Sequence, residues 1–149
     1  MLAIAIGPSP MLPPYLLAAV PAVLLAVIDL RCRRLPDRLV GAVAVLAGAP
    51  LAVLRPERIG PAVLAAGTVL LAYAILVLLG GLGLGDAKLA AVLALILGFA
   101  GWPAVLTGVL AAHLINGPIA LFLLVRGRRR ALPFGPALLV GALLALTTA

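Results

Sequence analysis

The sequence predicts an all-α, polytopic membrane protein with about six transmembrane helices, on the evidence of its composition and its long apolar runs. Of the 149 residues, 66% are hydrophobic and only 10% are charged, whereas a soluble domain carries about 25% charged residues. So little polar surface cannot cover a water-soluble globule. In lipid every backbone polar group needs an internal partner, which leaves helices or a closed barrel. The Leu- and Ala-rich runs do not alternate in twos, so helices are favoured.

The apolar runs divide into six predicted spans, each near or somewhat below the ~20 residues that cross a bilayer core. We expect them at about 11–29, 38–54, 60–79, 86–100, 102–125 and 131–148. The fourth is short and could form one long hairpin with the fifth, turning at residues 101–103. All six belong to a single domain that covers residues 1–149.

The basic residues predict the orientation of these spans. Nine of the eleven Lys and Arg residues fall in the first, third and fifth loops, and the other two, Arg55 and Arg58, fall in the second. Loops rich in Lys and Arg stay in the cytoplasm, so both termini should lie on the outer side. The basic clusters flank apolar runs, where orientation and lipid phosphates explain them. We therefore expect membrane lipid as a partner and no nucleic acid.

The four acidic residues are Asp29, Asp37, Glu57 and Asp86. Asp37 and Glu57 lie in basic loops, where pairing with a nearby Arg is a sufficient explanation. Asp29 ends the first span and Asp86 opens the fourth. The predicted topology puts these two at the same depth on the same membrane face, so they can be neighbours in space.

Two neighbouring carboxylates suit aspartyl proteolysis. Repulsion between them keeps one proton on the pair near neutral pH. The ionised member can take a proton from water while the protonated member polarises a peptide carbonyl, without a cofactor. The competing interpretation is that each Asp caps a helix or pairs with Arg31 or Lys88. With one Cys, Cys32, and one His in the chain, a zinc site of Cys and His ligands cannot be built, so we expect no metal.

Two further groups of residues have a functional and a structural interpretation. Gly81, Gly83 and Gly85 precede Asp86; they could let an extended peptide approach closely, or they could serve helix packing. A dinucleotide loop is disfavoured because no strand precedes them. His113 and Asn116 share a face of the fifth span, where they could relay protons or, more commonly, form hydrogen bonds between helices.

Three segments together resemble a known family. Residues 28–39, IDLRCRRLPDRL, resemble the first-aspartate motif of bacterial prepilin peptidases, also called type IV leader peptidases. Residues 83–88, GLGDAK, resemble their second motif, the GxGD sequence shared with presenilin-type intramembrane proteases. Residues 128–136, RRRALPFGP, are similar to the Pro-Phe-Gly-Pro segment that opens the family's last span. The three segments occur in the family's order over nearly the whole chain.

The resemblance implies that Asp29 and Asp86 are the catalytic pair of a peptidase at the cytoplasmic face of the bacterial cytoplasmic membrane. It implies prepilin or pseudopilin-like substrates, whose short basic leader is cut at the start of a hydrophobic segment. We expect the substrate to be bound by Gly83, Gly85, Lys88, Pro133, Phe134, Gly135 and Pro136. The two prolines remove helix donors and could make residues 133–136 a wall of the cleft, or they could mark an ordinary helix start.

Two departures from the family pattern matter. Asp37 stands where Asn is usual. Cys32 is alone and the long first loop of larger members is missing, so the zinc-binding domain and N-methyltransferase activity are not expected.

Two other functions stay open at the sequence level. Intramembrane carboxylates also mark ion paths, so the chain could be a small ion- or proton-coupled transporter. However, its halves share no visible motif, and an inverted repeat would put equivalent aspartates on opposite faces. The chain could also be a catalytically idle pilus-assembly subunit, although the presence of both Asp residues counts against that.

Overall fold

A computed structural model describes residues 10–32, 34–80, 82–126 and 133–148. Arg33, Gly81, Arg128, Arg129, Arg130 and the predicted start of the last span at 131 lie outside the described residues. No strand occurs within the described ranges. Four helices are long and apolar enough to cross a membrane, which confirms the predicted all-α membrane class.

The described residues form six helical stretches. They are α2 (Leu12–Cys32), a stretch made of α3 (Asp37–Val43), the π-helical η1 (Ala44–Gly48) and α4 (Ala49–Leu54), then α5 (Ile59–Leu78), α6 (Leu84–Gly98), α7 (Trp102–Val125) and α8 (Gly135–Thr148). A short 3₁₀ turn, η2 (Pro56–Arg58), joins α4 to α5. The predicted bounds agree closely; the largest difference among described residues is at the end of α2, which continues past Asp29 to Cys32.

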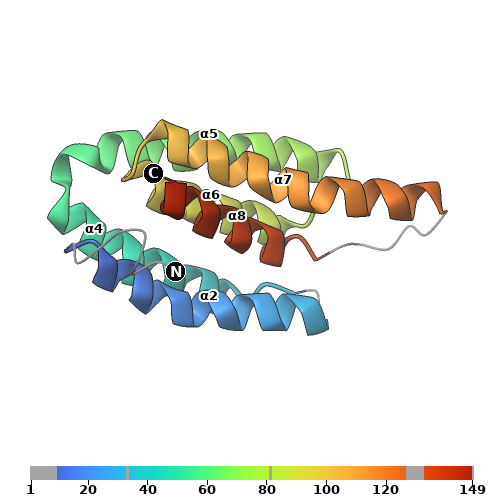
Figure 1. Cartoon of the computed structure of the whole chain (residues 1–149), viewed down its shortest axis with the longest axis horizontal. Coiled ribbons are helices and arrows are strands. Elements are labelled where there is room, and N and C mark those ends of the chain that lie inside the picture. The colour runs from blue at the N-terminus through green and yellow to red at the C-terminus, as the bar shows by residue number, and fades with distance from the viewer. Residues whose placement is uncertain (1–9, 33, 81, 127–132, 149) are drawn as a thin grey trace.

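The helices form an antiparallel bundle in which α6 is central. It packs against α3, η1, α5, α7 and α8, while α8 also packs against α2 and α7. In Figure 1 the start of α2 and the end of α8 both lie toward the left. The end of α2 and the start of α8 therefore lie at the opposite end of the bundle, where α6 also begins. We call this end of the bundle the site end.

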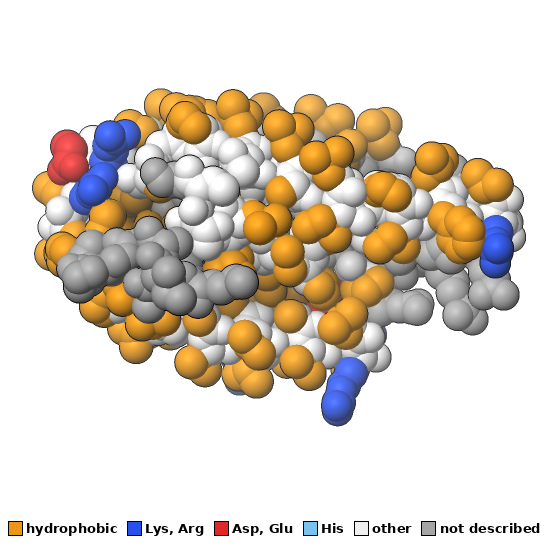
Figure 2. Space-filling model, in the orientation of Figure 1, with side chains coloured by type: hydrophobic (Ala, Val, Ile, Leu, Met, Phe, Trp, Pro, Cys, Tyr) orange, Lys and Arg blue, Asp and Glu red, His pale blue; other side chains and the backbone are white. Residues whose placement is uncertain are grey.

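The buried residues include many small ones, and a large share of the big apolar side chains is exposed. Many of the most buried residues are small, among them Ala47, Ala62, Ala112 and Ala145, each at most 1% exposed. Large apolar side chains face outward along the helices, and Figure 2 shows them over the visible face with charged groups toward the two ends. Small residues let helix backbones approach closely, which is how helices associate in lipid.

Candidate active site

Asp29 lies in the last turn of α2 and is only 4% exposed. Its Oδ2 accepts a hydrogen bond of 3.0 Å from the backbone N–H of Gly135, the first residue of α8. The first N–H groups of a helix have no partner within the helix. The carboxylate of α2 therefore satisfies a free donor of α8 and joins the first and last helices.

Asp86 is the third residue of α6 and is half-buried. Its Oδ2 accepts a hydrogen bond of 3.3 Å from the N–H of Gly83, just before the helix. The start of a helix also favours a negative charge. The Asp29 carboxylate lies within electrostatic range of Asp86. The structure thus brings the two predicted residues to one site, where each is oriented by one backbone amide.

The side chain of Leu35 packs closely against both Gly85 and Gly135. A methyl group added at Gly85 would lie 3.0 Å from Leu35 Cβ, and one added at Gly135 would lie 3.4 Å from Leu35 Cδ2. Leu35 therefore lies between the glycine that precedes Asp86 and the glycine that holds Asp29.

The ion pair of this region differs from the expected one. Asp37 was expected to pair with a nearby Arg, but both of its carboxylate oxygens lie 2.8 Å from Nζ of Lys88 on α6. The pair is solvent-accessible, with the side chains 50% and 70% exposed. Because Asp37 begins α3, the ion pair holds residues 34–37, and with them Leu35, against α6. No described ion pair joins Arg31 or Lys88 to either Asp29 or Asp86.

With this geometry in place, comparison with known families gives one match. The chain matches the type IV leader peptidase family over residues 15–125, a range that contains both aspartates. The chain belongs to this family. The match ends at residue 125, before the Pro-Phe-Gly-Pro segment at 133–136. A role for that segment is therefore supported only by its sequence resemblance and by the hydrogen bond from Gly135 to Asp29. No curated protein and no solved structure matches the chain significantly.

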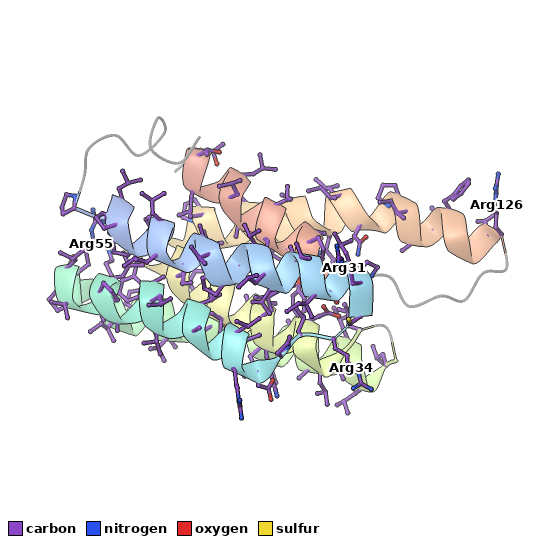
Figure 3. The ribbon with its side chains drawn as sticks, turned by 90° about the horizontal axis from the view of Figure 1, so that it is seen from below. Arg31, Arg34, Arg55 and Arg126 are labelled. Atoms are coloured by element: carbon purple, nitrogen blue, oxygen red, sulfur yellow. The ribbon has the colours of Figure 1, made fainter. Side chains whose placement is uncertain are left out.

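The described basic residues of this leader peptidase family member lie toward the two ends of the bundle, while Arg33, Arg128, Arg129 and Arg130 are outside the described residues. Figure 3 shows Arg31, Arg34 and Arg126 toward the site end and Arg55 at the other end. The guanidinium of Arg58 lies close to Gly101 in the α6–α7 turn, so the second and fourth loops share the far end. Arg31 and Arg34 therefore lie at the same end of the bundle as the aspartate pair, and Arg55 and Arg58 lie at the opposite end.

A cluster of three aromatic rings lies beside the pair, and sequence reasoning missed one of its members. Tyr73 of α5, His113 of α7 and Phe134 lie edge to face, with ring centroids 5.2 to 6.2 Å apart. Phe134 directly precedes Gly135. Nδ1 of His113 lies 2.8 Å from the carbonyl oxygen of Val109 on its own helix. Tyr73 sits in a uniformly apolar run, where only its hydroxyl distinguishes it.

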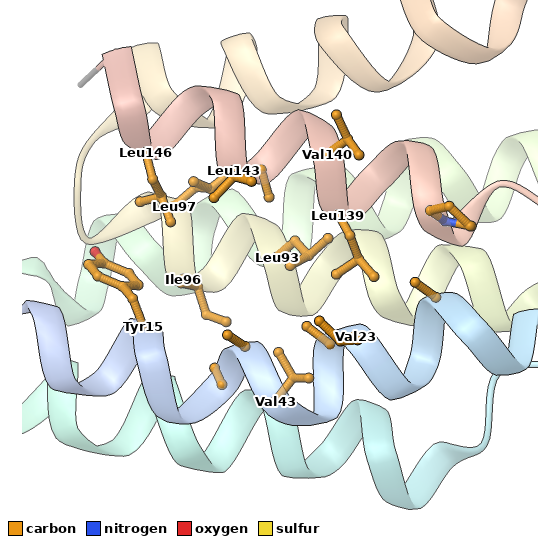
Figure 4. Close-up of a pocket in the computed structure, with 16 residues that line it drawn as sticks. Tyr15, Val23, Val43, Leu93, Ile96, Leu97, Leu139, Val140, Leu143 and Leu146 are labelled. Carbon is orange, nitrogen blue, oxygen red and sulfur yellow. The ribbon is translucent and has the colours of Figure 1, made fainter. Parts of the chain in front are cut away.

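An apolar cavity of about 320 Å³ runs between α2, α6 and α8. Figure 4 shows side chains from these three helices, such as Val23, Leu93 and Leu139, lining it. Ala26, one turn before Asp29, and Pro136, next to Gly135, also line it. One end of the cavity therefore reaches the immediate neighbours of the aspartate pair.

Proposed function

We propose that the protein is a membrane-embedded aspartyl endopeptidase that removes the short basic leader of prepilin or pseudopilin-like substrates. The reaction would take place at the cytoplasmic face of the bacterial cytoplasmic membrane. One observation carries the proposal. Asp29 and Asp86, far apart in the chain, lie within electrostatic range of each other in a leader peptidase family bundle, and each accepts a hydrogen bond from a backbone amide.

The proposed reaction uses the two carboxylates in different protonation states. The ionised carboxylate takes a proton from water, whose oxygen attacks the scissile carbonyl. The protonated carboxylate gives its proton to the carbonyl oxygen, and a tetrahedral intermediate forms. As the intermediate collapses, the C–N bond breaks and the leaving amine receives a proton from the pair. Both anchoring hydrogen bonds use Oδ2, which leaves the other oxygen of each carboxylate to face water and peptide.

The surroundings of the pair support the proposed substrate class. We assign Gly83, Gly85 and residues 133–136 to peptide binding because Gly83 and Gly135 bind the two carboxylates and the other residues are their neighbours in the chain. The apolar cavity begins beside Asp29 and would accept the hydrophobic segment that follows the cleavage point.

Ala22→Phe, which would fill the cavity, should then raise KM for a full-length prepilin. An unchanged KM would indicate that the cavity holds only lipid.

The test is a cleavage assay of the purified protein in lipid vesicles with a prepilin encoded beside it. Asp29→Asn and Asp86→Asn keep the size of each side chain but cannot hold the catalytic proton. We expect each to reduce cleavage by about 10³-fold or more, a transition-state loss of ~4 kcal/mol. Chelators and the Cys32→Ser variant should leave the rate intact.

Three outcomes would contradict the proposal. One is cleavage that survives either Asn substitution. Another is loss of cleavage with a chelator and its return with zinc, which would indicate a metallopeptidase. The last is absence of cleavage by the wild-type protein together with aspartate-dependent proton flux across the vesicle, which would favour the transporter.

A further inference from the structure

The hydroxyl of Tyr73 is the most unusual buried polar group in the described part of the chain. Tyr73 is 2% exposed, and its hydroxyl oxygen has no hydrogen-bond partner among the described residues. Leaving such a group unsatisfied costs roughly 1–3 kcal/mol. Buried polar groups without a partner are rare in native structures, and a catalytic role is one of the few explanations.

The surroundings of this hydroxyl are those of the aspartate pair. The Tyr73 ring packs edge to face against His113 and Phe134, and Phe134 precedes the glycine that binds Asp29. The Asp86 carboxylate lies within electrostatic range of the hydroxyl. The one described hydrogen bond to Asp86 comes from Gly83 and uses Oδ2, so Asp86 can accept another.

The packing of α5 does not require the hydroxyl. The remaining buried residues of this helix are Ala62, Ala65 and Val69, and a Phe ring at position 73 would make the same contacts with its two aromatic neighbours. Replacing an unpartnered buried hydroxyl by hydrogen removes a desolvation cost. Among the described residues the hydroxyl contributes no hydrogen bond to the fold, which points to a role in another state.

We propose that Tyr73 is a positioning residue of the catalytic pair, whose hydroxyl donates a hydrogen bond to the Asp86 carboxylate when peptide is bound. This inference rests on the proposed peptidase function. The hydrogen bond would fix the orientation of Asp86 toward the water and the scissile carbonyl. It would act on the chemical step and not on the affinity for the substrate.

The test compares Tyr73→Phe with the wild-type protein in the prepilin cleavage assay, with kcat and KM measured separately. We expect kcat to fall at least tenfold with KM within twofold of wild type and an unfolding temperature equal to or above wild type. Thr68→Val is the matched control, because it removes an exposed hydroxyl from the same helix, one bonded to the carbonyl of Leu64. It should keep wild-type kcat and KM.

Each other outcome overturns the inference in a recognisable way. A wild-type kcat in Tyr73→Phe shows that the hydroxyl does not act on the reaction, while the proposed function stands. A lower unfolding temperature shows that the hydroxyl is structural. An equal loss in Thr68→Val shows that the effect is not specific to position 73. A wild-type protein that does not cleave prepilin removes the proposed function and this inference together.

Discussion

The N–H of Gly135 reaches Asp29 because residue 135 has no side chain. A Cβ at this position would lie 2.8 Å from Asp29 Oδ2 and 3.3 Å from its Cγ. The first contact is closer than real side chains tolerate, so the carboxylate or the start of α8 would have to move. Position 135 therefore requires glycine, because the start of α8 lies too close to Asp29 of α2 for a side chain to fit between them.

We therefore expect Gly135→Ala to disable the enzyme while it leaves the bundle folded. A displacement of about 1 Å in a catalytic group can cost 10²-fold in rate, so kcat/KM for prepilin should fall by about that factor. Gly67→Ala is the control, because a Cβ at Gly67 meets nothing within 4 Å. Full activity of Gly135→Ala would show that Asp29 does not depend on this contact.

At this scale the sequence indicated the aspartates but not the groups that orient them. Alternate loops of a helical bundle share one end, so the meeting of Asp29 and Asp86 could be predicted. The bond from Gly135 to Asp29 spans 106 residues and leaves no local pattern. The partner of Asp37 was mispredicted for the same reason, because Lys88 lies 51 residues away and nearer arginines were available.

Among the helices, α7 and α8 depend on a close approach of their backbones. A Cβ at Gly141 of α8 would lie 2.9 Å from the backbone N of Ala112 on α7. A Cβ at Gly108, on α7, would lie 2.6 Å from Leu97 Cδ1 of α6 but in ordinary contact, 3.6 Å, with Ala145 Cβ of α8. A larger residue at 141 must separate the two helices.

Gly141→Leu should destabilise the fold by at least the ~1–3 kcal/mol typical of an overpacked core. Thermal unfolding in detergent should show a clear drop in midpoint. Gly67→Leu, on an exposed face of α5, should unfold at the wild-type temperature. Equal midpoints for the two variants would mean that α7 and α8 are not held by this contact.

Residues 34–37 contact α6 and α8 through Leu35 and contact α6 through the Lys88–Asp37 pair. An exposed ion pair contributes at most about 1 kcal/mol to stability, so Lys88→Ala and Asp37→Ala should unfold near the wild-type temperature. Each substitution breaks the same Lys88–Asp37 pair, so both single variants should raise KM for prepilin by the same few-fold factor. The double variant should have the same KM as either single variant. A rise in Lys88→Ala alone would support direct peptide binding by Lys88.

Helix bounds were predictable because Pro and Gly mark most of them, as at Gly101 and Trp102-Pro103. The π-helical turn of η1 was not predicted. It lies just before Pro50, whose ring and missing N–H disturb the helix at that point. A proline inside an apolar run indicates a break, but it does not indicate whether the helix kinks or widens.

For the molecule as a whole, the separation of basic residues predicts one orientation in the membrane. In a Cys32→Ser background, a cysteine at Arg34 should react with an impermeant thiol reagent only from the cytoplasm. A cysteine at Glu57 should react only from outside. Both positions are exposed. Arg34 and Arg55 lie at opposite ends of the bundle, and Glu57 is in η2, directly after Arg55. Labelling of both from the same side would rule out the six-span arrangement.

The bond between Gly135 and Asp29 also has a consequence for biogenesis. A ribosome delivers Asp29 to the membrane long before it has made residue 135, so the first aspartate enters the bilayer without the amide that later holds it. Asp86 can take its own amide from Gly83 as soon as α6 begins. The aspartate pair is therefore complete only after α8 has been inserted and packed. A nascent chain that stalls before that point would carry both carboxylates in the membrane without an assembled site.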